Sequence, residues 1–194
     1  MTTSSPAPGR RRFAVARWSA LSVLVVVAVL VAVLATRPSS SEQLADSPLV
    51  GKRAPGLAGP ELAGSRRVSL ASYKGRWVLV NFFASWCTVC VEEAPELERF
   101  SETRPDGLRP AVLSVLYGDT RADGIRFERA EGATWPAVYD RSGAIAEAWG
   151  VGSLPRSYLV SPGGRVIACI LGGITSSQLD TLVERRSGKG GVPT

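Results

Sequence analysis

The longest apolar run in this chain lies near its N-terminus. Residues 18–36 are uncharged throughout and consist mostly of Val, Leu and Ala. At a rise of about 1.5 Å per residue, a helix of this length matches the roughly 30 Å hydrocarbon core of a bilayer. No polar face interrupts the run, as it would in a helix packed against a soluble core. The pattern therefore predicts a single transmembrane helix at residues 18–36.

Shorter apolar runs predict strands, and apolar residues at helical spacing predict helices between them. Residues 77–83 and 111–117 are nearly continuous apolar runs, typical of strands buried on both faces. The other expected strands are residues 67–70, 135–140, 157–160 and 165–171, of which the last two form a hairpin. The expected helices are residues 92–101, 124–131, 144–149 and 176–186. This alternation indicates an α/β fold: a mixed central sheet flanked by helices, with an N-terminal β extension.

The remaining segments organise the chain around one globular domain. A chain of 194 residues, 45% of them hydrophobic, can bury one ordinary core. Residues 37–48 are rich in Ser and Pro and lack periodicity, which is typical of a linker. Residues 49–187 carry the expected strands and helices, and we expect residues 188–194, rich in Gly, to be a disordered tail.

The formal net charge of +6 is concentrated at the N-terminus. Residues 1–37 hold five arginines and no acidic residue, whereas the rest of the chain holds 18 basic and 17 acidic residues. The globular part is therefore nearly neutral, and a nucleic-acid partner loses its support. Four arginines precede the apolar run and one follows it. This bias predicts a cytoplasmic tail at residues 1–17 and a domain on the outer side of the cell membrane.

Two other export signals fit the same N-terminal residues. Residues 33–35 could serve as a small-residue cleavage site, which would make residues 1–35 the removable signal peptide of a secreted protein. Residues 10–13 loosely match a twin-arginine signal. The apolar run is longer than the usual core of a signal peptide, which favours an uncleaved anchor. All three interpretations place the domain outside the cytoplasm.

The candidate chemistry lies in the cysteine pair Cys87 and Cys90, between the expected strand 77–83 and the helix that follows it. At the N-terminus of that helix, free backbone N–H groups and the helix dipole favour a thiolate on Cys87. A lowered pKa makes Cys87 the nucleophile. Helical spacing brings Cys90 near enough to attack the first sulfur. Cys90 is thus the expected resolving thiol of a redox-active disulfide.

Other uses of the two cysteines fit less well. A structural zinc site needs about four ligands, but the chain has three cysteines and no histidine. Attachment of a c-type haem needs a histidine after the pair, where Val91 stands. An inert structural disulfide remains open, although a loop this short constrains little unfolded-chain entropy. We expect no cofactor and no metal.

Several of these residues resemble the thioredoxin superfamily. The resemblance rests on residues 81–90 (NFFASWCTVC), on Pro95 after the second cysteine, and on the pair Leu154 and Pro155. The N-terminal segment containing residues 51–55 and the expected anchor narrow it to the TlpA, ResA and CcmG (DsbE) type. The resemblance covers residues 49 to about 185. It implies a thioredoxin fold and a kink of the helix at Pro95.

The resemblance also implies roles for Pro155 and Leu154. Pro155 matches the cis-proline of the family, which would leave the backbone of Leu154 free to pair with an extended substrate segment. An ordinary trans proline is the alternative. We expect Trp86 to pack beside the dithiol, shield the disulfide and help to bind substrate, although a core tryptophan would also explain it. Arg156 stands where CcmG-type proteins often have an acid, so the CcmG assignment is in doubt.

Glu93 follows Cys90 by three residues, at the edge of the apolar stripe of the helix. A carboxylate near the two sulfurs would disfavour a thiolate on Cys90 and could carry its proton. ResA-type proteins have an acid at this offset, so the resemblance implies a catalytic role for Glu93. The alternative is a solvated charge on the helix surface, as expected for Glu92.

The resemblance favours a thiol-disulfide oxidoreductase that reduces disulfides of client proteins, such as the disulfide in the haem-attachment motif of apocytochrome c. Its electrons would then come from a membrane donor of the DsbD or CcdA type. An oxidant that forms disulfides, or an anchored binding module with a structural disulfide, remains open; a thiol peroxidase fits the dithiol pattern less well. We expect Cys169 to be a buried free thiol, with pairing to a partner as the alternative.

Overall fold

The computed structural model describes residues 25–29, 44–102 and 110–188. The chain forms two units, Met1–Ser39 and Ser40–Thr194. In the first unit, residues 25–29 are helical and exposed. No helix within the described ranges is both long and apolar enough to cross a membrane. Residues 1–17, most of the predicted span 18–36, residues 37–43 of the predicted linker and residues 189–194 lie outside the described residues.

The second unit is built on a five-stranded mixed sheet with the strand order β5-β4-β3-β6-β7. Strand β3 pairs in parallel with β4, which pairs in parallel with β5. On its other side β3 pairs antiparallel with β6, which forms a hairpin with β7. The strands are Val78–Phe83 (β3), Ala111–Tyr117 (β4), Ala137–Asp140 (β5), Arg156–Val160 (β6) and Val166–Leu171 (β7). The mixed sheet predicted from the apolar runs is confirmed.

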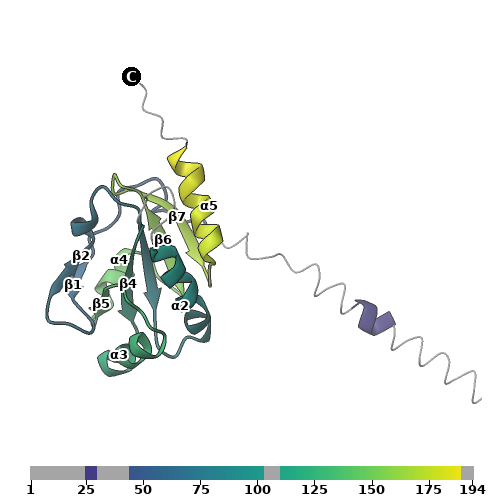
Figure 1. Ribbon diagram of the computed structural model, residues 1–194, viewed down its shortest axis with the longest axis horizontal. Coiled ribbons are helices and arrows are strands. Elements are labelled where there is room, and N and C mark those ends of the chain that lie inside the picture. The colour runs from purple at the N-terminus through teal and green to yellow at the C-terminus, as the bar shows by residue number, and fades with distance from the viewer. Residues whose placement is uncertain (1–24, 30–43, 103–109, 189–194) are drawn as a thin grey trace, which may run out of the picture. The chain divides into compact units, whose positions relative to one another are not determined.

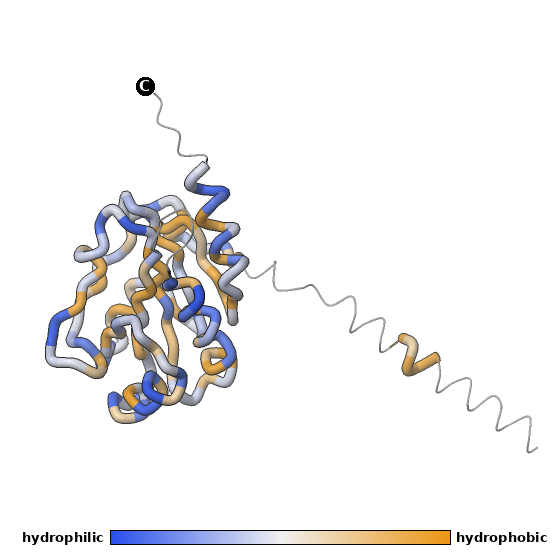
Figure 2. Tube along the Cα trace, viewed as in Figure 1, coloured by the Kyte–Doolittle hydropathy of each residue, from blue (hydrophilic) through white to orange (hydrophobic). Residues whose placement is uncertain are grey.

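Helices α2 (Thr88–Ser101) and α5 (Ser176–Ser187) cover one face of the sheet and contact each other (Figure 1). Alternate residues of the strands point toward them and the others toward the opposite face, and because both faces are covered, β3 is buried along its whole length. Figure 2 shows apolar residues along the strands and hydrophilic residues on the outer helices. The core under these two helices is formed by Trp77, Leu79, Leu97, Phe100, Val112, Leu159, Ala168, Ile170, Ile174, Leu179 and Val183.

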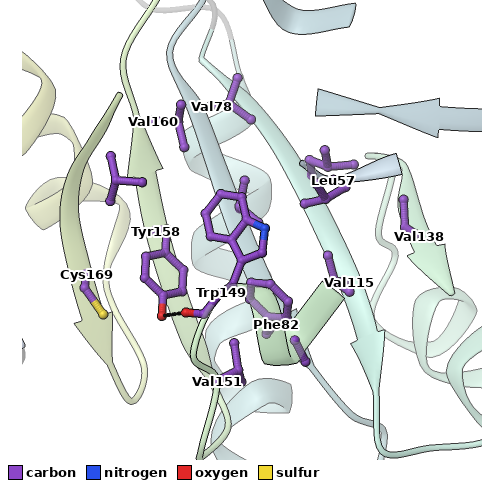
Figure 3. Packing of buried hydrophobic residues seen from close by; sticks show 14 of the residues in the cluster. Leu57, Val78, Phe82, Val115, Val138, Trp149, Val151, Tyr158, Val160 and Cys169 are labelled. Atoms are coloured by element: carbon purple, nitrogen blue, oxygen red, sulfur yellow. Dashed lines mark hydrogen bonds between the residues drawn. The ribbon is translucent and has the colours of Figure 1, made fainter. Parts of the chain in front are cut away.

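The opposite face of the sheet packs around Trp149, which follows α4 (Ala144–Ala148). Its ring centroid lies 5.0 Å from that of Tyr158 and 5.9 Å from that of Phe82 (Figure 3). The hydroxyl of Tyr158 donates a hydrogen bond of 2.5 Å to the backbone carbonyl of Trp149. Cys169 of β7 belongs to the same cluster and is a free thiol with 1% of its surface exposed. The prediction of a buried thiol is confirmed.

The N-terminal extension contains a strand that the sequence did not reveal. Strand β1 (Ala58–Pro60) pairs antiparallel with β2 (Arg67–Ser69), ahead of the short 3-10 helix η2 (Leu70–Tyr73). The Gly and Pro residues around β1 mask a strand of only three residues, so its segment shows no strand pattern. The predicted linker, residues 37–48, also extends too far at its C-terminal end. Leu44 bridges to Ile170, so the folded unit includes residues 44–48.

Two helices begin earlier than their apolar patterns predict. Helix α2 starts at Thr88 rather than residue 92, directly after Cys87. Helix α3 (Arg121–Ala130) starts three residues before the expected residue 124, because the Thr120 hydroxyl accepts the backbone N–H of Asp123 as an N-cap. The first turns of both helices show no apolar stripe at helical spacing, so only capping marks where they begin.

Candidate active site

Cys87 and Cys90 form a disulfide at the N-terminus of α2. Strand β3 ends at Phe83 and a short loop leads to Cys87, which is the N-cap residue of the helix. The Cys87 sulfur accepts the backbone N–H of Cys90 at 3.2 Å. This N–H group and the helix dipole favour negative charge on the Cys87 sulfur once the disulfide is reduced. The placement predicted from the sequence is confirmed, and it suits Cys87 for nucleophilic attack.

Glu93 lies one turn after Cys90 on α2 and is buried, with 3% of its surface exposed. The side-chain amide of Asn81, from β3, donates a hydrogen bond of 2.9 Å to Glu93 Oε2. The backbone N–H of Ile174, between β7 and α5, donates to Glu93 Oε1 at 3.2 Å. The alternative of a solvated surface charge is therefore wrong for Glu93. It holds for Glu92, which is exposed.

Burial raises the pKa of Glu93 to about 7, although the hydrogen bonds from Asn81 and Ile174 act in the opposite direction. Residues at positions i and i+3 of a helix are neighbours on its surface, so this carboxyl group lies on the same side of α2 as Cys90. A carboxyl group with a pKa near neutrality can both take up and release a proton at physiological pH. Glu93 is thus suited to exchange a proton with the resolving thiol.

Trp86 precedes the nucleophile and lies at the surface, with 65% of its area exposed. Its indole N–H donates a hydrogen bond of 3.1 Å to the carbonyl of Gly118, in the loop after β4. In the same loop, Asp119 Oδ2 accepts the backbone N–H of Ser85 at 2.7 Å. The alternative that Trp86 is a tryptophan of the hydrophobic core is therefore wrong. The two contacts hold the segment before Cys87 against the end of β4.

The peptide bond between Leu154 and Pro155 is cis, as the resemblance implied. Arg156, the first residue of β6, pairs with Phe82 of β3. The register therefore sets Pro155 beside the end of β3, where the chain turns toward Cys87. Leu154 packs against the apolar cluster that contains both cysteines. The structure brings Pro155 and Leu154 to the dithiol; their role in substrate binding stays a prediction.

One large cavity of the domain lies away from this chemistry. It has a volume of about 580 Å³ and is lined among others by Arg53, Tyr73, Val78 and Val160. Val78 and Val160 pair at the end of β3 that is remote from the disulfide. None of the predicted site residues lines this cavity. Among the described residues, no group of three or more His, Cys, Asp or Glu side chains could hold a metal ion.

Sequence reasoning missed three partners of the predicted site: Asn81, Asp119 and the backbone N–H of Ile174. Asn81 did leave a signal, because it is a polar residue inside the otherwise apolar strand β3, and a buried amide needs partners. It finds them in Glu93 and in the hydroxyl of Ser157, which accepts its second N–H at 3.0 Å. No pattern along the chain marks Ile174.

Comparisons with known proteins identify relatives of this chain. Residues 50–169 match the model of the AhpC/TSA family. The chain is 32% identical over 136 residues to the thiol-disulfide oxidoreductase ResA of Geobacillus thermodenitrificans, an alignment covering 70% of this chain and 76% of that protein. A second relative, ResA of Bacillus subtilis, is 27% identical over 120 residues, or 61% of this chain and 66% of that protein.

Solved structures show the same fold. The thioredoxin domain of a thiol-disulfide oxidoreductase from Bacteroides vulgatus superimposes with a TM-score of 0.62 and 27% identity, covering 72% of this chain and 98% of that one. A thiol:disulfide interchange protein of the DsbE type from Chlorobium tepidum gives a TM-score of 0.63 at 24% identity, covering 70% and 96%. The chain therefore belongs to the AhpC/TSA family within the thioredoxin superfamily, as a thiol-disulfide oxidoreductase whose dithiol is Cys87 and Cys90.

Proposed function

We propose that the domain acts outside the cytoplasm as a reductant of client-protein disulfides, among them that of apocytochrome c during cytochrome c maturation. The Cys87 thiolate attacks the client disulfide and forms a mixed disulfide. Cys90 then attacks Cys87, which releases the client as a dithiol and leaves the Cys87–Cys90 disulfide. A membrane dithiol donor of the DsbD or CcdA type returns the two electrons. Residues 18–36 anchor the domain, and a cleaved signal peptide is the second candidate for this segment.

The buried carboxyl group of Glu93, one turn from Cys90, is the observation that carries the direction of electron flow. A dithiol couple becomes more oxidising when its reduced, thiolate form is stabilised. A negative charge beside Cys90 has the opposite effect, because it disfavours a second negative charge on the sulfur. Glu93 therefore supports a reducing couple.

Exposed apolar side chains surround the disulfide and support a protein client. Trp86, Val89 and Val91 are exposed by 65%, 41% and 37% respectively. Exposed apolar residues that gather at one place on a soluble domain mark a site of protein contact. A client segment with apolar residues beside its cysteines would cover this surface while its disulfide reaches Cys87.

The midpoint potential of Cys87 and Cys90, measured against a thiol redox buffer, tests the direction. We expect a value at or below that of thioredoxin, about −270 mV. A value near that of DsbA, about −120 mV, would instead assign the protein as an oxidant. Glu93→Gln is expected to raise the potential by on the order of 30 mV above neutral pH. Glu92→Gln, which removes an exposed acid from the same turn, should leave it unchanged.

A trapping experiment tests the client. In Cys90→Ser, the mixed disulfide with Cys87 cannot be resolved and accumulates. We expect it to form with an oxidised peptide that carries the Cys-x-x-Cys-His motif of apocytochrome c. If no protein or peptide disulfide is captured, the enzyme role toward proteins gives way to the anchored binding module.

A further inference from the structure

Glu93 alone leaves the proton of Cys90 without a path to solvent. Each oxygen of the Glu93 carboxylate accepts a hydrogen bond from a buried donor, and the side chain is almost completely covered. Cys90 is also buried, with 4% of its surface exposed. A proton that passes between these two groups stays in the interior unless a further group connects them to solvent.

A small cavity lies beside Cys90, on the side of α2 that faces α3. Its volume is about 10 Å³, at the lower limit of what one water molecule needs. The polar side chains that line it come from four elements: Cys90 of α2, Asn81 of β3, Ser114 of β4 and Glu128 of α3. Phe83, Phe127 and Trp135 are among the apolar side chains that close it. The cavity thus places the resolving cysteine and a second carboxyl group around the same space.

Glu128 is half-buried, so it reaches the cavity and remains in contact with solvent. Within the described part of the chain, its carboxylate has no hydrogen bond or ion pair. Burial raises the pKa of Glu128 to about 7, and the negative charge of Glu61 contributes to the rise. Glu61 is itself paired with Arg66. Glu61 is therefore the acidic neighbour that acts on Glu128, and Cys90 lies across the cavity.

We propose that Glu128 is a proton-relay residue that exchanges the proton of Cys90 with solvent across this cavity. When Cys90 attacks the mixed disulfide, its thiol proton passes to the Glu128 carboxylate. The Cys90–Cys87 bond forms, the bond from Cys87 to the client sulfur breaks, and the client leaves as a thiolate that is protonated by solvent. When a dithiol donor later reduces the disulfide, the proton returns from Glu128 to the departing Cys90 thiolate.

The inference rests on thiol–disulfide exchange itself and not on the proposed direction of electron flow. Cys90 must lose a proton when it attacks and gain one when it leaves, whichever way the electrons move. A potential that contradicts the reductant role therefore leaves this proposal standing, and its test uses a rate rather than a potential.

The test isolates the resolving step with a chromogenic aryl disulfide, 5,5′-dithiobis(2-nitrobenzoate). The reduced protein is first converted to the mixed disulfide on Cys87 at acidic pH, where Cys90 is protonated. A rapid pH jump then starts the attack by Cys90, and release of the coloured thiolate reports its rate. We expect Glu128→Gln to slow this release at least about tenfold near neutral pH, less than the roughly 10²–10⁴-fold effect of a base in direct contact. The deficit should vanish at alkaline pH, where Cys90 ionises unaided.

Two further variants and one control separate proton transfer from structural damage. Glu128→Asp keeps the carboxyl group and should keep most of the rate, and formate should restore the rate of Glu128→Ala by entering the enlarged cavity. Glu131→Gln removes an acid at the end of the same helix that does not line the cavity. A wild-type rate in Glu128→Gln at every pH would overturn the proposal. So would a deficit that is the same at all pH values, or one that Glu131→Gln reproduces.

Discussion

The side-chain amide of Asn81 donates hydrogen bonds to Glu93 Oε2 at 2.9 Å and to the Ser157 hydroxyl at 3.0 Å. One amide group therefore ties α2, β3 and β6 together directly beneath the active site. It also sets the charge state of the site, because its bond to the Glu93 carboxylate partly offsets the effect of burial on the pKa.

Glu93→Gln should change how the stability of the oxidised protein depends on pH. In the folded protein the pKa of Glu93 is about 7, above its ordinary value of 4.5. The folded state then binds more protons than the unfolded state between these pH values, so the stability provided by protonated Glu93 is lost as the pH rises. Between the unfolded-state and folded-state pKa values of Glu93, this loss in the free energy of unfolding amounts to about 3 kcal/mol. Urea titrations should show Glu93→Gln gaining stability over the wild type as the pH rises from 4.5 to above 7.

Glu128 is present in both the wild type and Glu93→Gln, so its effect on the pH dependence of stability is common to the two proteins. The difference between their unfolding free energies therefore reports the titration of Glu93. Lost or altered hydrogen bonding to Ile174 in Glu93→Gln would shift the whole curve without changing its slope. If the difference in stability is constant over this pH range, the raised pKa of Glu93 is wrong.

Asn81→Ala should raise the pKa of Glu93 further. The variant removes the donor to Glu93 Oε2 and leaves the carboxyl group buried, so the charged form loses part of its support. The titration of the Glu93 carboxyl carbon, followed by NMR, should move to higher pH. Ser157→Ala is the matched control, since it removes the other partner of Asn81 and keeps its bond to Glu93. If the pKa of Glu93 shifts equally in both variants, the hydrogen bond from Asn81 is not what lowers it.

Substitution by alanine should affect stability at one tryptophan and client binding at another. Trp149 is completely buried between Phe82 and Tyr158, so Trp149→Ala should lower the free energy of unfolding by about 3–5 kcal/mol. Trp86 is largely exposed, so Trp86→Ala should cost less than about 1 kcal/mol. Its effect should instead appear in client capture by Cys87. Denaturant unfolding and the trapping assay measure the two effects, and a stable Trp86→Ala with undiminished capture would remove this residue from the binding surface.

Asp119→Ala should loosen the loop that carries Trp86 and Cys87. Asp119 accepts the backbone N–H of Ser85 at 2.7 Å and that of Thr120 at 2.6 Å. Losing an ionised acceptor for these two donors should cost about 1–2 kcal/mol. Amide hydrogen exchange should speed up at Ser85. Asp119→Asn retains an oxygen acceptor and should fall between the wild type and Asp119→Ala.

Thiol counting should distinguish the three cysteines. In the native oxidised protein a polar thiol reagent should find no reactive thiol, because Cys169 is buried and the other two cysteines are joined. Unfolding in denaturant should expose one thiol, and unfolding after reduction should expose all three. A reactive thiol in the native oxidised protein would mean that Cys169 is accessible and available to a partner.

Local patterns along the sequence determined much of this protein. Apolar runs predicted all five strands of the central sheet, and the position of Cys87 and Cys90 between a strand and a helix predicted a nucleophile at the helix N-terminus. These features depend on neighbours in the chain, because strand burial and helix capping are set within a few residues. Strand β1 escaped the pattern, since its three residues leave no period to detect.

The environment of each site residue was decided only by the tertiary structure. The sequence left Glu93 either solvated or buried, and left Trp86 either at the surface or in the core. Glu93 is buried because Asn81, from a strand, and Ile174, from the loop before α5, meet its two oxygens. Glu128 reaches the cavity beside Cys90 only because α3 packs against the ends of β3 and β4. Contacts between residues so far apart in the chain follow from how the elements pack, and no periodicity along the sequence records them.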